Sequence, residues 1–208
     1  MNKIAIYGAG GLGKEVKVII DAINAQQSGR EYDFIGYFDD HRSAPDVIGG
    51  LTELNQWSDP MQLVLAIGNP SIKVGLAEQI SNIHVSYATL IHPRAEIGND
   101  KHVRIGEGSI IASGAQLTTD IVIGRHVLIN LNVTVGHDSS ILDFSSIMPG
   151  ANISGQVLVS KASLIGAGAN VLNGIVVGEN ATVGAGAVVV KDVENATTVV
   201  GVPGKVIK

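Results

Sequence analysis

The stretch IGAGANVLNGIVVGENATVGAGAVVV, residues 165–190, decides the fold because its pattern repeats every six positions. From Ile105 to Val189, an aliphatic residue occupies fifteen consecutive positions of this series, and a small or β-branched residue follows each one four places later. An α-helix needs a period of about 3.6 and a simple strand a period of 2. A period of six is typical of short strands joined by tight turns, which wind into a β-helix solenoid.

Three hexads make one triangular coil, so fifteen hexads give five coils. Ile91 and Ile97 begin the series early, before a two-residue slip around Asp100–His102. Residues 89–208 are therefore expected to form one parallel β-helix with an aliphatic interior.

Residues 1–88 follow a different pattern, in which runs of strand type alternate with helical spacing. Val16, Ile19, Ile20 and Ile23 share one face of a helix. The expected strands are residues 3–8, 32–40, 62–69 and 84–92, and the expected helices are residues 11–27 and 71–81, the latter with Ser71 as N-cap. This alternation predicts a small Rossmann-like α/β domain with a parallel sheet.

Composition excludes several classes of function. The 208 residues include no cysteine and carry a net charge of −5, without a basic run. Nucleic acid is therefore not an expected partner, and disulfides, thiolate catalysis and cysteine-based zinc sites are excluded. The sequence has no signal-peptide pattern and no run of about 18 apolar residues, so a cytoplasmic protein without a membrane partner is expected.

A family resemblance is carried by five segments besides the repeat, namely IYGAGGLGKEV (6–16), GYFDD (36–40), AIGN (66–69), IHPRAEIG (91–98) and VGVPGKVIK (200–208). With them, the chain resembles over nearly its whole length the sialic acid O-acetyltransferase and nucleotide-amino-sugar N-acetyltransferase family of left-handed β-helix acyltransferases. The resemblance implies a left-handed β-helix, acetyl-CoA as the donor, and a nucleotide-activated sugar as a frequent acceptor. It also implies a homotrimer with active sites between neighbouring β-helices.

The stretch TVGHDSS, residues 134–140, places a histidine beside an aspartate in an apolar tract. Val135 is an inward position, so the turn after it should present His137 to solvent, one coil before Gly155. A histidine of near-neutral pKa can remove a proton from an amine or a hydroxyl, and a nearby carboxylate fixes its tautomer. The alternative is a solvated turn histidine. Support from Asp138 is weakened because neighbouring side chains in an extended chain point opposite ways.

The resemblance implies roles for these residues. His137 corresponds to the general base of the family, Asp138 to an acidic neighbour, and Asn130 to an asparagine close to the base. Gly155 leaves its N–H unobstructed at a level where it can bind the thioester oxyanion.

The other histidines give weaker signals. His126 is expected to be a solvated surface residue and His92 a domain-junction residue, whereas His41, His84 and His102 have no partner pattern. No HxH or HxxxH spacing occurs, so no metal site is expected.

Gly8, Gly10 and Gly13 satisfy GxGxxG between an expected strand and an expected helix. Such a turn presents backbone N–H groups to phosphate, and an acid at the end of the second strand commonly contacts ribose or base. The domain is too small for a full dinucleotide fold, and a tight turn without a ligand is the alternative. The resemblance favours a nucleotide-sugar site made of Gly8, Gly10, Gly11, Leu12, Gly13, Asp39, Asp40, Asn69 and Lys73, the last as a phosphate counter-charge.

Two positions depart from the family pattern. Many relatives have histidine where this chain has Leu12, a position that faces the acceptor sugar, and Ser146 also replaces a frequent histidine. The resemblance places acetyl-CoA along the flank of the β-helix, near Gly155, Ser146, Ala167, Gly168, Ala185 and Lys205. Small residues that a solenoid turn needs anyway are the alternative.

The expected function is transfer of acetyl from acetyl-CoA to the amine of a nucleotide-linked sugar, in the biosynthesis of surface glycans. One alternative is an O-acetyltransferase for a free sugar, sialic acid or serine-like acceptor. Another is a non-catalytic nucleotide-binding scaffold.

Overall fold

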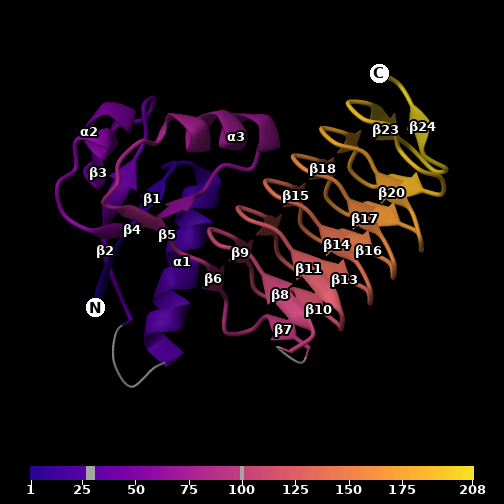
Figure 1. Cartoon of the computed structure of the whole chain (residues 1–208), viewed down its shortest axis with the longest axis horizontal. Helices are drawn as coiled ribbons and strands as arrows, with labels where there is room; N and C mark the ends of the chain where they lie inside the picture. Colours follow the sequence, from indigo (N-terminus) through magenta and orange to yellow (C-terminus); the bar gives the residue numbers. More distant parts are fainter. Residues whose placement is uncertain (27–30, 99–100) are drawn as a thin grey trace.

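The computed structural model describes residues 1–26, 31–98 and 101–208, which form a small α/β domain followed by a long solenoid (Figure 1). The α/β domain is one parallel sheet of five strands in the order β3-β2-β1-β4-β5. Its elements are β1 (Asn2–Tyr7), α1 (Gly11–Gln26), β2 (Tyr32–Phe38), β3 (Val47–Gly49), α2 (Leu51–Asn55), β4 (Met61–Leu65), α3 (Pro70–Gln79) and β5 (Val85–Tyr87). The predicted parallel α/β domain is confirmed; Gln27, the last residue of the first predicted helix, lies outside the described residues.

Three details of this domain differ from the expectation. Strand β3 and the short helix α2 were not predicted, because 47–55 has neither a long apolar run nor a sustained helical period. The expected strand 84–92 is two strands, since β5 ends at Tyr87 in the first sheet and β6 (Leu90–Ile91) begins the solenoid.

Helix α3 begins one residue earlier than predicted. Its N-cap is Asn69, whose side-chain oxygen accepts a hydrogen bond from the N–H of Ile72 at 3.2 Å, and Pro70 takes the first helical position. Ser71 is therefore not the cap; its hydroxyl donates to the Asn69 side chain at 2.8 Å.

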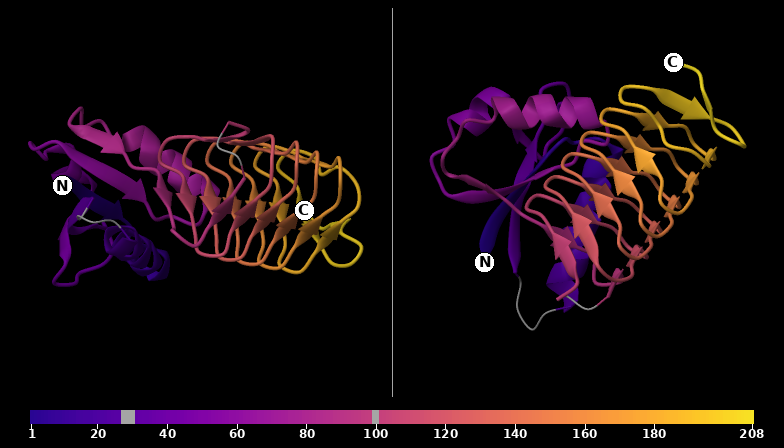
Figure 2. Two further views of the ribbon diagram at one scale, coloured as in Figure 1. Left: turned by 90° about the horizontal axis from the view of Figure 1, so that it is seen from below. Right: turned by 45° about the vertical axis from the view of Figure 1, so that its right-hand side comes forward.

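The second part is a left-handed parallel β-helix (Figure 2). Strands three hexads apart pair in register, as Gln116 with Thr134 and Thr134 with Asn152. An eight-stranded sheet holds β6, β9 (Ile110–Ile111), β12 (Leu128–Ile129), β15 (Ser146–Ile147), β18 (Leu164–Ile165), β21 (Thr182–Val183), β23 (Thr198–Val200) and β24 (Lys205–Val206). A six-stranded sheet holds β7 (Glu96–Ile97), β10 (Gln116–Leu117), β13 (Thr134–Val135), β16 (Asn152–Ile153), β19 (Asn170–Val171) and β22 (Val188–Val189). A five-stranded sheet holds β8 (Val103–Ile105), β11 (Ile121–Ile123), β14 (Ser140–Ile141), β17 (Leu158–Val159) and β20 (Val176–Val177).

Three corners join these sheets. The first corner (residues 130–133 and their equivalents on the other coils) lies between the eight- and six-stranded sheets. The second corner (residues 136–139 and equivalents) lies between the six- and five-stranded sheets, and the third (residues 142–145 and equivalents) leads back to the eight-stranded sheet. The expected slip around Asp100–His102 begins in residues 99–100, which lie outside the described part of the chain.

The interior of the solenoid is a set of aliphatic columns. Ile111, Ile129, Ile147 and Ile165 stack along the eight-stranded sheet, and each is fully buried. Serines at the small positions are buried too, and their hydroxyls donate to carbonyls of the following coil, as Ser145 does to Ser160 at 2.8 Å. These serines fit the core because their hydroxyls are satisfied.

Helix α1 lies between the two parts of the chain and packs against β6. Val16, Ile19 and Ile20 form one buried cluster with Ile110 and Leu128 of the solenoid. Within the described residues, no helix is long and apolar enough to cross a membrane.

The buried columns predict a large cost for shortening one side chain. Ile147→Ala leaves a cavity among stacked neighbours and should lower stability by about 2–5 kcal/mol. Ile83→Ala, at a residue 90% exposed, is the matched control and should leave the Tm nearly unchanged. Thermal unfolding of both variants checks this, and equal Tm values would contradict the predicted columns.

Candidate active site

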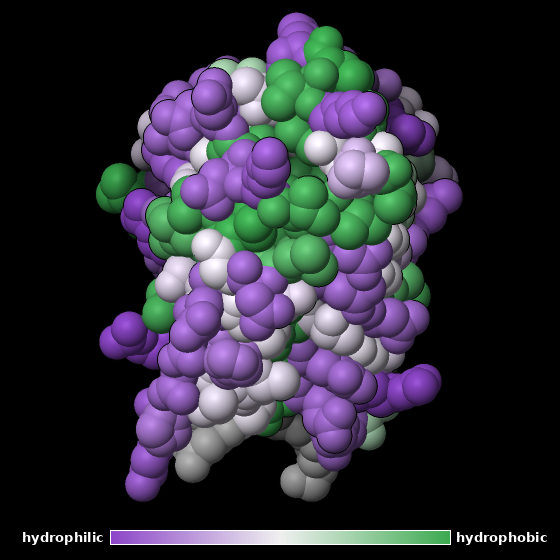
Figure 3. Space-filling model, turned by 90° about the vertical axis from the view of Figure 1, so that its right-hand side faces the viewer, coloured by the Kyte–Doolittle hydropathy of each residue, from purple (hydrophilic) through white to green (hydrophobic). Residues whose placement is uncertain are grey.

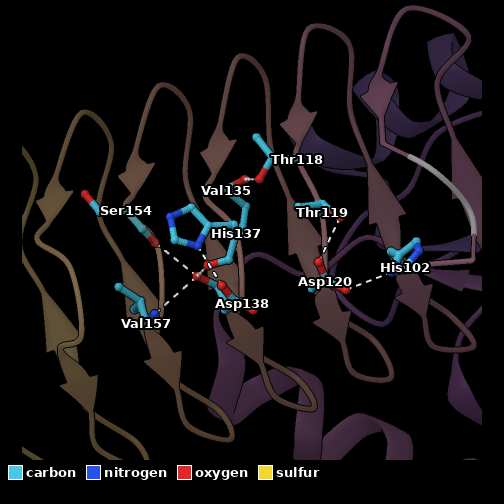
Figure 4. Close-up of polar contacts among 10 residues, drawn as sticks. His102, Thr118, Thr119, Asp120, Val135, His137, Asp138, Ser154 and Val157 are labelled. Carbon is cyan, nitrogen blue, oxygen red and sulfur yellow. Dashed lines mark hydrogen bonds and ion pairs between the residues drawn. The ribbon is translucent and has the colours of Figure 1, made fainter.

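His137 lies at the second corner, between β13 and β14, with its imidazole on the outside of the coil (Figure 4). Its Nδ1 is 2.7 Å from Oδ2 of Asp138, and about half of each side chain is exposed. The pair meets because Asp138 has a left-handed φ of 58°, which removes the extended geometry that separates neighbouring side chains. The expected weakness of this contact is therefore wrong. With Nδ1 held by the carboxylate, Nε2 is the nitrogen available to a ligand.

Gly155 lies one coil beyond His137, and the imidazole rests against it. A Cβ at Gly155 would lie 2.6 Å from Nε2 and 2.7 Å from Cε1 of His137, so a side chain does not fit while the ring stays in place. The N–H of Gln156 donates to the His137 carbonyl at 2.7 Å, and no described residue accepts a hydrogen bond from the N–H of Gly155. The second corner thus combines an imidazole with an unpaired backbone donor.

A second His–Asp pair lies on the same side of the solenoid (Figure 4). Nδ1 of His102 is 2.8 Å from Oδ1 of Asp120, and the Thr119 hydroxyl donates to the other oxygen of Asp120 at 2.9 Å. His102 was expected to have no partner; the stacking of position 102 on position 120, one coil later, supplies it. Among the described residues, no group of three or more His, Cys, Asp or Glu side chains can hold a metal ion.

The glycine turn after β1 divides into two kinds of position. Gly8 and Gly13 are required by packing, since Gly8 has a φ of +108° and a Cβ at Gly13 would lie 1.9 Å from the Gly8 carbonyl oxygen. Gly11 has open space around it instead, and a Cβ at Gly10 would meet only the Arg42 side chain, at an ordinary contact distance of 3.8 Å. The turn therefore has the close helix–strand packing of a nucleotide-binding turn and leaves its outer backbone accessible.

Arg42 is a candidate that the sequence analysis missed. Its guanidinium lies 3.8 Å from the Cβ position at Gly10, and it lines a cavity of about 240 Å³ together with Lys14. Nothing in the sequence motif places a residue 32 positions away beside the glycine turn; the β2–β3 loop does so.

Asp39 and Asp40, at the end of β2, hold the surrounding backbone. Asp39 accepts hydrogen bonds from the N–H groups of Ala9, His41 and Arg42, and Asp40 accepts from the Leu51 N–H and the Tyr7 hydroxyl. Burial raises the pKa of both carboxyls, most strongly at Asp39, but these bonds outweigh it and lower the pKa of each. Both line a cavity of about 380 Å³ at the carboxyl ends of the strands, with Leu51 and Ile72 on its walls.

Lys73 and Ser146 do not lie in the sites expected for them. Lys73 is 1% exposed, and its amine donates to the Ser146 hydroxyl at 3.1 Å and to the Ser145 carbonyl at 3.4 Å. Lys73 thus docks α3 onto the β-helix and does not reach a phosphate site. Ser146 is fully buried under this amine, so it does not lie on an accessible donor flank.

Asn69 also has a structural role, because its side-chain oxygen caps α3. His126 differs from the expected surface residue as well. It is 7% exposed, stacks on Phe144 with ring centroids 4.9 Å apart, and meets the edge of Tyr87. Burial and nearby Lys73 lower the pKa of His126 to about 4. His126 is therefore a packed neutral residue at the domain junction.

Most of the remaining expected residues lie at the first corner. Asn130 is 5% exposed and follows β12 at the first corner, so it does not reach His137 within one chain. Ala167 and Ala185 also lie at the first corner, with Gly168 beside them, whereas Gly155 lies at the second. Lys205 is exposed on β24 at the carboxyl end of the solenoid. Apart from Lys205 and the buried Ser146, the candidate donor residues of one chain therefore lie along both edges of the six-stranded sheet.

The buried amine of Lys73 makes stability depend on pH. Burial lowers its pKa to about 7 from an ordinary value near 10.5. Between these values the native state binds fewer protons than the unfolded chain, so the stability of the native protein rises with pH across this window. Lys73→Met removes this dependence. The variant should have a higher Tm than the native protein at pH 7, by about 2–4 °C for each kcal/mol gained, and a smaller advantage at pH 9.5.

Thermal unfolding of both proteins at the two pH values measures this difference. Lys161→Met, at an exposed lysine, is the matched control and should show the same Tm difference at both. A constant advantage of Lys73→Met would contradict the account of the buried amine.

Comparison with known proteins gives one match to the α/β domain and several to most or all of the chain. Residues 3–80 match the family model for the PglD N-terminal domain. GDP-perosamine N-acetyltransferase of Escherichia coli O157:H7 is 31% identical over 172 residues, which cover 80% of this chain and 76% of that protein. PerB from Caulobacter crescentus, solved in complex with CoA and GDP-perosamine, has a TM-score of 0.86 at 28% identity and covers 100% of this chain and 98% of its own.

The acetyltransferase domain of PglB from Neisseria gonorrhoeae FA1090, solved with acetyl coenzyme A, has a TM-score of 0.86 at 32% identity, and the match covers 100% of both chains. These similarities extend over the α/β domain, the β-helix and the join between them. The chain therefore belongs to the sialic acid O-acetyltransferase and nucleotide-amino-sugar N-acetyltransferase family of left-handed β-helix acyltransferases, and it is an acetyltransferase.

Proposed function

We propose that the protein transfers an acetyl group from acetyl-CoA to the amine of a nucleotide-linked amino sugar, in glycan biosynthesis. The observation that carries this proposal is the second corner, where the imidazole of His137 is held by Asp138 and lies against Gly155. The acetyl-CoA and GDP-perosamine complexes of the similar structures support the choice of substrates.

The reaction follows from these groups. The acceptor amine attacks the thioester carbonyl while Nε2 of His137 takes a proton from the nitrogen. Asp138 stabilises the imidazolium that forms, and the N–H of Gly155 donates to the oxyanion. Collapse of the tetrahedral intermediate breaks the C–S bond, and the imidazolium proton passes to the sulfur, which leaves as the CoA thiol.

We place the nucleotide in the cavity that Tyr7, Asp39 and Asp40 line. It lies at the carboxyl ends of β1 and β4, where the strand order reverses, and ligands of open α/β sheets bind at this point. The diphosphate then lies over Gly10 and Gly11, beside Arg42 and Lys14, whose positive charges suit it. Asp39 and Asp40 shape this cavity through the loops that they brace.

We propose a homotrimer in which the first corner of one copy faces the second corner of the next. Asn130 and His137, both assigned to the reaction, lie at different corners of one chain, and so do the candidate donor residues. Apolar side chains also gather on the upper part of the face in Figure 3, toward the carboxyl end. Exposed apolar residues of the last coils are Leu172, Val176, Val190, Val202, Val206 and Ile207.

The two parts correspond to a nucleotide-sugar domain, residues 1–88, and an acetyltransferase domain, residues 89–208. The proposed donor is a cytoplasmic metabolite, so we place the enzyme in the cytoplasm.

His137→Ala tests the proposed base directly. Removing the base should lower kcat by about 10²–10⁴ without lowering the Tm, because the side chain is half exposed. Release of CoA thiol is the readout, and the absence of cysteine means that the protein itself contributes no thiol signal. His84→Ala, at an exposed histidine, is the matched control.

Mass spectrometry of the product distinguishes N- from O-acetylation. Full activity of His137→Ala would overturn the assignment of the base. Transfer only to hydroxyls of nucleotide-free sugars would overturn the proposed acceptor.

Gly155→Ala should lower kcat only by displacing the imidazole of His137. The new Cβ would occupy the place of the imidazole, and the ring must move. We expect kcat to fall at least about 10-fold. The double variant Gly155→Ala/His137→Ala should be no slower than His137→Ala, since the two changes affect one interaction. Additive losses in this cycle would contradict the contact.

A further inference from the structure

Ser139 places a buried hydroxyl inside the second corner, two residues after His137. Among the described residues, the equivalent positions on the other coils are all aliphatic and buried. They are Val103, Ile121, Val157, Ile175 and Val193. Within this column, a hydroxyl therefore occurs only at the level of His137, and the reaction described above gives it no role.

The Ser139 hydroxyl links its own coil to the next one. It accepts a hydrogen bond from the N–H of Val157 at 3.2 Å and donates to the carbonyl of Ser154 at 3.0 Å (Figure 4). The His137 carbonyl lies farther away, at 3.4 Å, and it already accepts from the N–H of Gln156 at 2.7 Å. The single hydroxyl hydrogen thus favours Ser154, to whose carbonyl no other described residue donates.

The Ser154 carbonyl and the Gly155 N–H belong to the same peptide group. In a trans peptide the C=O and the N–H point in opposite directions. Because the carbonyl points inward to the buried Ser139, the N–H points out of the coil, on the side where the imidazole of His137 lies. The same hydrogen bond makes the N–H a stronger donor, since linked hydrogen bonds polarise one another.

We propose that Ser139 is a positioning residue for the oxyanion site. The N–H of Val157, the hydroxyl of Ser139 and the Ser154–Gly155 peptide form one chain of hydrogen bonds, which ends at the thioester oxygen. Ser139 does not touch the substrate; it fixes the direction of the Gly155 N–H and raises its strength as a donor. The inference rests on the proposed function, because that function places the oxyanion at Gly155.

The substitutions Ser139→Val and Ser139→Thr separate the hydroxyl from the shape of the side chain. They add nearly the same shape, valine is already the residue at this place on the next coil, and only threonine keeps the hydroxyl. We expect Ser139→Val to lower kcat about 5- to 50-fold, less than the roughly 10²–10³-fold loss of a whole oxyanion donor, and Ser139→Thr to recover most of it. Both KM values should change less than about 2-fold, because the oxyanion forms only in the transition state.

Ser163 supplies the matched control at the third corner. Its buried hydroxyl donates to the Gly178 carbonyl, fifteen residues along the chain, at 2.7 Å, as Ser139 does to Ser154. Ser163→Val should lower the Tm about as much as Ser139→Val, since each leaves a buried carbonyl without its donor, but it should not change kcat. An equal loss of kcat in both valine variants, an unchanged kcat in Ser139→Val, or a threonine variant as slow as the valine variant would overturn the proposal.

The pH profile of kcat/KM distinguishes the peptide group from the imidazole. Ser139→Val should lower kcat/KM by the same factor at every pH, because His137 and its partner Asp138 stay in place. A displaced profile would assign the effect to His137 and overturn the role of the peptide. Failure of the proposed function is a separate outcome, in which the native protein itself releases no CoA thiol with any nucleotide-linked amino sugar, whereas each result above is measured in an active enzyme.

Discussion

The rest of the structure depends on one constraint, the stacking of inward aliphatic side chains at intervals of three hexads. Val135 rests between Leu117 and Ile153, and the backbone strands pair at the same spacing. A one-residue slip would turn every inward side chain outward, so the columns fix the register of each coil. That register then fixes the corners, and with them the level of His137 relative to Gly155.

Much of this arrangement could be predicted from the sequence. The period of six indicates the solenoid because no helix or simple strand shares it, and stacking by three hexads places Gly155 next to His137. Gly8 and Gly13 were predictable because their spacing belongs to a known turn. In each case a local or periodic rule determines the position of the residue.

The failures at Lys73 and His126 have a common physical cause, which is packing between the two parts of the chain. Nothing local in the sequence indicates that Lys73 is buried on Ser146, or that His126 is enclosed by Tyr87 and Phe144. His102 was a different kind of failure, because applying the period of three hexads to polar positions would have paired it with Asp120. The two corners of the candidate site could be counted from the sequence, but the proposed packing of a second copy against them could not.

The central proposal is that one active site uses the second corner of one copy and the nucleotide-sugar site of the next. Mixed trimers test it: His137→Ala lacks the base, and Leu12→Trp places a large side chain in the first turn of α1, beside the glycine turn of the nucleotide-sugar site. Each variant alone should be inactive. After co-expression in equal amounts, random assembly leaves about a quarter of the interfaces with both halves intact, so about a quarter of the native activity should return. No recovery in mixed trimers would show that each site is built within a single chain and would contradict the account.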